Sequence, residues 1–337
     1  MPDQSEDRRG RVEAVRTEVR NRRKADIMQI RTVAMIGAGN VGAFVVRGLD
    51  GALGENLWVI AEGERRARLQ REGIIINDVP YALHVRTPEE AKGADLIIIG
   101  VKYAALRGIL PAVRTIASPH TLVMSLMNGV DSEEILSEVV PKERIVPAMI
   151  RFVADRDGNR IHIRPTQPGL GIRYGAVNGV PAEESLCALD ALFAASELEA
   201  ERDDQILISM WSKFAFNICE NLPQAILDVG IGCYEDSEHA SRIRTSLWNE
   251  TRLVAAAEGV AIPPETKHIS SPQFPKDAIY STLQDLRAGR KTEVEMFAGT
   301  LVRLADAHGL AVPVAETVYH LICALEEKND GCFRYEP

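Results

Sequence analysis

Three glycines at a fixed spacing follow a short apolar segment, and they constrain the fold of this chain more than any other feature. The segment VAMI at residues 33–36 leads into Gly37, Gly39 and Gly42, a GxGxxG pattern directly before a helical segment. In that context Gly37 permits a tight turn, Gly39 allows the backbone to approach a pyrophosphate, and Gly42 lets helix and strand pack closely. The phosphates would then bind free N–H groups at the positive end of the helix. The candidate cofactor-binding residues of this loop are Gly37, Ala38, Gly39, Asn40, Val41 and Gly42.

A glutamate ends the second apolar segment, twenty residues after the last of these glycines. At this position Glu62 can accept hydrogen bonds from the ribose hydroxyls of adenosine, and its charge would repel a 2′-phosphate, so it favours NAD over NADP. Arg65 and Arg66 follow closely and could still recruit a 2′-phosphate. The cofactor is therefore NAD or NADP, with NAD favoured, and a glutamate without a ligand role is the alternative.

Apolar segments alternate with amphipathic ones through the first half of the chain. Short buried runs separated by helix-length segments indicate βαβ units around a parallel sheet. Beyond Asp203 the β pattern stops and long helical segments follow. The predicted fold is α/β, an N-terminal Rossmann-type doubly wound parallel sheet at residues 28–202 followed by an all-helical C-terminal domain at 203–330 for substrate binding or dimerisation. Charge-rich residues 1–27 are predicted to be a disordered or frayed extension, and residues 331–337 a tail.

The composition argues against several classes of partner. The 337 residues carry 39 lysines and arginines against 48 acids, and the net charge of -9 gives no general attraction to nucleic acid or to anionic lipid. No segment approaches the roughly 18 apolar residues that span a bilayer, and no secretory signal follows the N-terminal charges. The five cysteines lack metal-binding spacing. We expect a cytoplasmic protein with reduced thiols, no metal and a small-molecule substrate.

Polar residues follow two predicted strands and line one predicted helix. Lys102 comes after LIIIGV and Asn128 after LVMSLM, at strand ends where open parallel sheets bind ligands. In SKFAFNICENLPQ, Lys213, Asn217 and Asn221 recur at every fourth position and would share one helix face. Burial would lower the pKa of the lysine and make it a suitable acid, and the amides could bind a hydroxyl or a carboxylate. The alternative is that this stripe is only the solvated face of the helix.

Five segments are more specific than any single residue: GAGNVG, GVKY, SLMNGV, WSKFAFNICENLPQA and STLQDLRAGRKTEVEMFAGTLVRLADAHGLAVP. The last segment contains Ser281, Asp285 and Glu293 beside a run of basic residues. Taken alone, this basic run is typical of a solvated helix end. Together they resemble the ketopantoate reductase family, the 2-dehydropantoate 2-reductases of pantothenate biosynthesis. The resemblance covers the chain from Met28 to about Lys328.

The resemblance implies an NAD(P)-dependent 2-oxo acid reductase with defined roles for these residues. Lys213 would be the general acid that protonates the ketone oxygen as hydride arrives, and Glu293 would orient this lysine and bind the substrate's hydroxyl. Ser281 would bind the substrate's carboxylate, the two helix asparagines would contact its hydroxyl end, and Lys102 would line the cofactor side with Asn128. The implied catalytic residues are Lys213 and Glu293, the substrate-binding residues are Asn128, Asn217, Asn221, Ser281 and Asp285, and Glu62, Lys102 and Asn128 join the glycine loop in binding the cofactor.

Two alternatives to a ketopantoate reductase remain at this point. NADP-dependent family members commonly carry an arginine where this chain has Glu62, and the family also contains NAD-linked D-2-hydroxyacid dehydrogenases that act on branched or aromatic 2-oxo acids. Because Glu62 is acidic, an NAD-linked dehydrogenase of this kind remains an alternative function. A dinucleotide-sensing module without catalysis is the non-enzyme alternative. A homodimer through the helical domain rests on family analogy.

Overall fold

Six parallel strands form the central sheet. The computed structural model describes residues 28–165, 169–266, 268–270, 274–333 and 335, and the predicted extension at residues 1–27 lies outside them. The strands are β1 (Val33–Ile36), β2 (Leu57–Ile60), β5 (His84–Arg86), β6 (Leu96–Ile99), β7 (Leu122–Ser125) and β8 (Ile145–Val146). Their order, β5-β2-β1-β6-β7-β8, reverses direction between β1 and β6. This is the doubly wound arrangement that the sequence predicts, and its ligand position lies beyond the carboxyl ends of the strands at that reversal.

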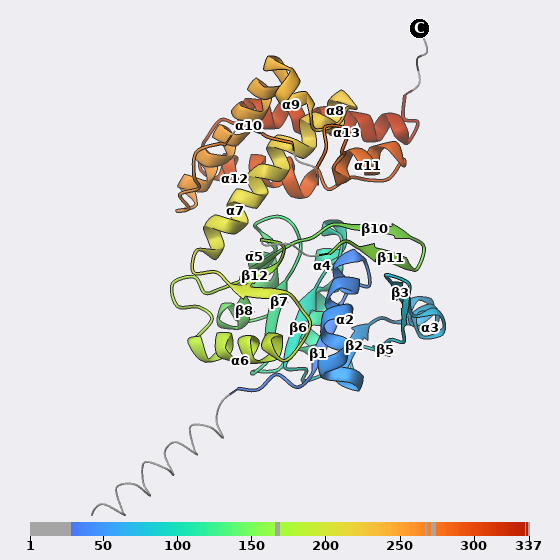
Figure 1. The fold of residues 1–337 in the computed structure, drawn as a ribbon. Helices are drawn as coiled ribbons and strands as arrows, with labels where there is room; N and C mark the ends of the chain where they lie inside the picture. The colour runs from blue at the N-terminus through green and yellow to red at the C-terminus, as the bar shows by residue number, and fades with distance from the viewer. Residues whose placement is uncertain (1–27, 166–168, 267, 271–273, 334, 336–337) are drawn as a thin grey trace, which may run out of the picture.

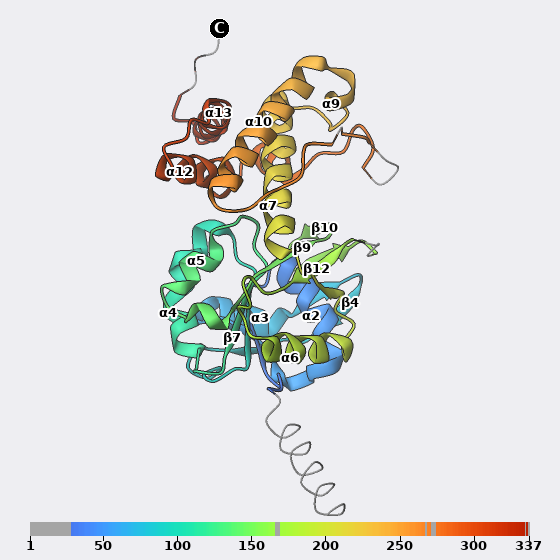
Figure 2. The same ribbon diagram turned by 90° about the vertical axis from the view of Figure 1, so that its left-hand side faces the viewer.

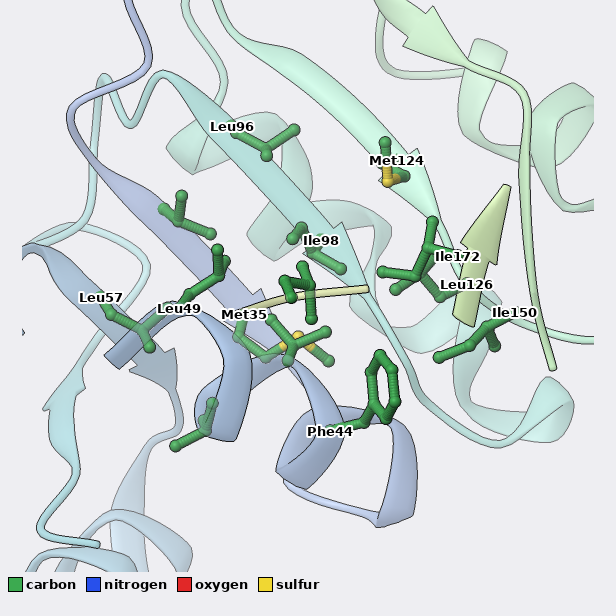
Figure 3. Close-up of a cluster of buried hydrophobic side chains, with 14 of the residues drawn as sticks. Met35, Phe44, Leu49, Leu57, Leu96, Ile98, Met124, Leu126, Ile150 and Ile172 are labelled. Carbon is green, nitrogen blue, oxygen red and sulfur yellow. The ribbon is translucent and has the colours of Figure 1, made fainter. Parts of the chain in front are cut away.

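Helices cover both faces of this sheet, which explains why its central strands β1 and β6 are apolar throughout. In β1, Val33 and Met35 pack into one core and Ala34 and Ile36 into the other. Figure 3 shows the first core, in which Met35 and Phe44 pack with side chains from neighbouring strands. In Figure 2, α2 and α6 lie on one side of the sheet and α4 and α5 on the other. The helices of this part are α2 (Asn40–Leu53), α3 (Gly63–Glu72), α4 (Leu106–Ile116), α5 (Ser132–Ser137) and α6 (Glu183–Ala194), with 3₁₀ turns η1 (Gly54–Asn56), η2 (Tyr103–Ala105) and η3 (Lys142–Arg144).

Two smaller sheets contain the remaining strands of this part of the chain. One has the order β10-β11-β3-β4, and the other has the order β13-β12-β9. The first contains β3 (Ile74–Ile76), β4 (Val79–Tyr81), β10 (Ala154–Asp157) and β11 (Arg160–Ile163), and the second contains β9 (Ala148–Arg151), β12 (Gly171–Tyr174) and β13 (Ala200–Arg202). The sequence shows a β pattern up to Asp203, but no local pattern reveals that β11 pairs with the distant β3.

The chain is helical from Ile206 onward, and this part lies above the sheets in Figure 1. Its core is separate and includes Phe214, Leu247 and Phe297. The elements are α7 (Ile206–Phe216), the π-helical turn η4 (Asn217–Asn221), α8 (Leu222–Leu227), α9 (Cys233–Asp236), α10 (Glu238–Ala257), α11 (Ser281–Arg287), the π-helical turn η5 (Glu295–Gly299), α12 (Thr300–Ala307) and α13 (Pro313–Asn329). The predicted succession of a doubly wound sheet and a helical region is confirmed, while the exact domain bounds stay a prediction. In the part of the chain that the structure describes, no helix has the length and apolarity to cross a membrane.

Candidate active site

The glycine loop lies between β1 and α2. Two of its three glycines, Gly37 and Gly42, are tightly packed, as the sequence predicts. Gly37 has a φ of 114°, and an added Cβ would lie 2.4 Å from the carbonyl oxygen of Gly100. A Cβ on Gly42 would lie 2.1 Å from the carbonyl oxygen of Gly37, so α2 can approach the strand only with glycine there. A Cβ on Gly39 would meet nothing closer than 3.9 Å. Packing within the protein therefore explains Gly37 and Gly42, and the space beside Gly39 fits the close approach of a pyrophosphate.

Glu62 is exposed at the carboxyl end of β2, directly before α3. The two arginines that follow it have different surroundings. The Arg66 guanidinium forms an ion pair with Glu90 at 3.0 Å, whereas Arg65 forms none within the described residues. The carboxylate is thus available to a ribose, and only Arg65 of the two remains without a carboxylate partner.

Lys213, Asn128 and Glu293 form a chain of hydrogen bonds that joins the sheet to the helical region. The ammonium of Lys213 donates to Asn128 Oδ1 at 2.7 Å and to the Ile150 carbonyl at 2.5 Å. Asn128 Nδ2 donates to Glu293 Oε2 at 3.4 Å. The resemblance assigns the orientation of the lysine to Glu293, but the direct contacts come from Asn128 and from a backbone carbonyl. Glu293 acts on the lysine through Asn128 and through its charge.

The surroundings of Lys213 change its acidity. Burial lowers the pKa of Lys213 to about 7, repulsion from Arg151 adds to this effect, and attraction from Glu293 opposes it. A lysine with a pKa near neutrality can both donate and recover a proton, which is the property that a general acid requires. The geometry and the lowered pKa therefore support acid chemistry at this residue.

Asp285 connects a second pair of elements, and its carboxylate is already occupied. Oδ2 lies 3.4 Å from the Lys102 ammonium, and Oδ1 accepts a hydrogen bond from Arg290 Nε at 2.8 Å. Asp285 itself is buried, so these two cations offset the cost of placing its charge there. Asp285 thus joins the strand-end Lys102 to α11, and its role in binding substrate stays a prediction.

Three further predicted substrate residues lie in the helical region, two on a π-helical turn and one at the start of α11. Asn217 and Asn221 begin and end the π-helical turn η4, which interrupts the continuous α-helix that their spacing assumes. Asn221 is buried, and its Oδ1 has no hydrogen-bond partner. Ser281 is exposed at the first position of α11. Among the described residues, no hydrogen bond joins any of these three side chains to Lys213.

The sequence gives no signal for two groups that the structure places next to Lys213. The Ile150 carbonyl is a backbone group at the end of a buried strand, and any residue type would supply it. Arg151 follows it in β9 and carries no motif. For metals, no group of three or more histidine, cysteine or acidic side chains in the described residues could bind an ion, and all five cysteines are free thiols.

Comparisons with known proteins agree with this arrangement. Residues 33–179 match the family model described as Ketopantoate reductase PanE/ApbA, and residues 205–326 match its C-terminal model. A 2-dehydropantoate 2-reductase from Pyrococcus horikoshii is 24% identical over 304 residues, covering 89% of this chain and 99% of that protein.

Two solved structures share the fold over most of the chain. D-mandelate dehydrogenase in complex with NADH and anilino(oxo)acetate has a TM-score of 0.76 at 23% identity, and a PanE/ApbA family ketopantoate reductase from Ralstonia eutropha has a TM-score of 0.73 at 24% identity. Each covers 89% of this chain and 99% of the compared chain. Because the two family models together span most of the sequence, the chain is an NAD(P)-dependent oxidoreductase and belongs to the ketopantoate reductase family.

Proposed function

We propose that this protein reduces the ketone of a 2-oxo acid with a reduced nicotinamide cofactor, and that ketopantoate is its substrate. The observation that carries the proposal is the partly buried Lys213, whose hydrogen bonds reach across from the helical region to the sheet. Family membership supports the reaction class. The bound cofactor would supply the hydride that adds to the carbonyl carbon.

The hydrogen bonds of Lys213 suit a single proton transfer. An ammonium group has three N–H donors, and Asn128 and the Ile150 carbonyl accept two of them. The third is free to point at the oxygen of a bound ketone, on which negative charge develops during the reaction. After the proton has moved, the neutral amine retains two N–H groups for the same two acceptors. Lys213 can therefore keep its hydrogen bonds to Asn128 and to the Ile150 carbonyl in both protonation states, without rearrangement.

For the cofactor, we propose NAD as the preferred form. The exposed carboxylate of Glu62 lies at the end of β2, where it can accept hydrogen bonds from ribose and repel a 2′-phosphate. The ion pair of Arg66 with Glu90 supports this preference, because it engages one of the two arginines that could favour NADP.

For the substrate, Asn221 supports an oxo acid that carries a hydroxyl group. A buried acceptor without a hydrogen bond costs about 1–3 kcal/mol, and a substrate hydroxyl would satisfy Oδ1 of this residue. The second candidate is an NAD-dependent D-2-hydroxyacid dehydrogenase, supported by Glu62 and by the similarity to D-mandelate dehydrogenase. The cytoplasmic location and the homodimer stay predictions.

Initial rates with NADH and NADPH, each with ketopantoate and with 2-oxoisovalerate, test the proposal. We expect turnover of ketopantoate with a preference for NADH. Activity on 2-oxoisovalerate alone would assign the protein to the hydroxyacid dehydrogenases, because that acid lacks the hydroxyl. Cofactor binding without turnover of any oxo acid would contradict an enzyme and favour a sensing module.

The rate of reduction should depend on pH through Lys213. The acid form of the lysine is required, so kcat for ketone reduction should be highest below pH 7 and fall about tenfold per pH unit well above it. Oxidation of the hydroxy acid needs the neutral amine, so its kcat should instead rise with pH and level off above about 7. Profiles in both directions at saturating substrate test this. A reduction rate that is flat from pH 6 to pH 9 would contradict the role of Lys213 unless a step other than proton transfer limits turnover, which a solvent isotope effect of one would reveal.

A further inference from the structure

A hairpin distant in sequence lies against the glycine loop. In Figure 1, β10 and β11 lie close to the N-terminal end of α2. Two hydrogen bonds make the contact: Arg156 Nη1 donates to the Ala38 carbonyl at 3.1 Å, and Asn40 Nδ2 donates to the Ala154 carbonyl at 3.4 Å. The hairpin thus places a cation beside the residues that would surround the phosphates of a dinucleotide.

Two arginines of α3 lie near the same cation. Arg65 and Arg68 are three positions apart and share a helix face. Burial lowers the pKa of Arg156, and repulsion from these two guanidinium groups lowers it further. Over the described ranges none of the three forms an ion pair with a carboxylate, unlike Arg66. The sheet order β10-β11-β3 explains the cluster, because α3 leads directly into β3. Three like charges without a counterion are unfavourable unless an anion joins them.

The open side of Gly39 faces Arg156. The atom nearest to a Cβ built on Gly39 is Arg156 Nη1, at 3.9 Å. Asn40 Oδ1 is buried and has no hydrogen-bond partner. Of the five N–H groups of Arg156, the Ala38 and Gly158 carbonyls accept two, which leaves three for a ligand. The guanidinium is thereby oriented by the protein and still has donors to offer.

We infer that Arg156 binds the pyrophosphate of the cofactor, from the hairpin side, while the N–H groups at the start of α2 bind it from the other. The inference rests on the proposed function and adds to it a phosphate-binding residue outside the glycine motif. A guanidinium group matches phosphate oxygens in geometry and charge, and hydrogen bonds between charged groups are the strong ones. Arg65 and Arg68 contribute to the positive potential without an assigned contact.

Titration of NADH, ADP and adenosine against the full chain with Arg156→Gln tests the inference. Loss of a charged hydrogen-bonding partner should raise the Kd for NADH and for ADP about 10- to 100-fold. The Kd for adenosine, which carries no phosphate, should stay unchanged. Arg156→Lys should restore part of the loss, because it keeps the charge. In the unmodified protein, added salt should weaken ADP binding and leave adenosine binding unchanged.

The matched control is Arg160→Gln in the same hairpin. Within the described residues the Arg160 guanidinium pairs only with the exposed Asp78, at 3.6 Å, so the Kd for all three ligands should stay unchanged. Unaltered ADP affinity in Arg156→Gln would overturn the inference. An equal loss for adenosine would also overturn it, since Arg156 would then only position the loop. If ADP binding depends on Arg156 but no oxo acid is reduced, the proposed function fails and the inference stands.

Discussion

Replacing Lys213 with methionine should lower kcat for ketone reduction by about 10²- to 10⁴-fold, the usual contribution of a general acid. Methionine fills a similar unbranched volume but cannot protonate the alkoxide. It also removes the donor to Asn128 Oδ1 and to the Ile150 carbonyl. The affinity for NADH should change little, because the glycine loop lies on a separate element. Single-turnover rates with NADH already bound would measure the loss in the chemical step.

Lys276→Met provides the matched control for this experiment. Lys276 is exposed and pairs with Asp236 at 2.5 Å in the helical region. Its replacement should leave kcat unchanged. The residual activity of Lys213→Met should also lose the fall in rate near pH 7. If Lys213→Met is folded, binds NADH and keeps more than half of the unmodified kcat, another group must be the acid.

Local constraints explain which parts of the fold and site the sequence predicts. The glycine loop is predictable because its residues act within one strand, one turn and one helix. The position of Asn128 follows similarly from the end of an apolar run, since strand ends of a parallel sheet meet at one edge. The contact between Lys213 and Asn128 then requires only that α7 lies beside the end of β7.

The parts that the sequence does not predict depend on long-range pairing or on backbone groups. Arg156 reaches the glycine loop only because β11 pairs with β3, with Ile75 opposite Arg160. No local pattern encodes that register. The carbonyl of Ile150 has no side-chain signature at all.

The π-helical turns are a third kind of difference. Counting every fourth residue from Lys213 assumes a continuous α-helix, but η4 begins at Asn217. A second π turn, η5, begins two residues after Glu293. Such turns are frequent at functional sites, and here they adjoin both predicted catalytic residues. Helical periodicity alone therefore does not predict these two turns.

Gly42→Ala should have the second large effect, on cofactor binding. The new Cβ would lie 2.1 Å from the Gly37 carbonyl oxygen, so either the loop or α2 must move. Both are backbone, and neither can yield as a flexible side chain would. A displaced loop would lose hydrogen bonds from its N–H groups to the phosphates, and a hydrogen bond to a charged group is worth about 1.5–3 kcal/mol. We therefore expect the Kd for NADH to rise about 10- to 100-fold for each bond lost. Overpacking should also lower the free energy of unfolding by about 1–3 kcal/mol.

Gly51→Ala separates the effect of this contact from that of losing a glycine in the same helix. Gly51 also lies in α2, but a Cβ there would meet no atom within 4 Å. Alanine should therefore raise the free energy of unfolding by about 0.5–1 kcal/mol and leave NADH affinity unchanged. Urea unfolding and NADH titration on both variants test the comparison. If Gly42→Ala binds NADH as tightly as Gly51→Ala does, the close packing of α2 on the loop is not what forms the phosphate site.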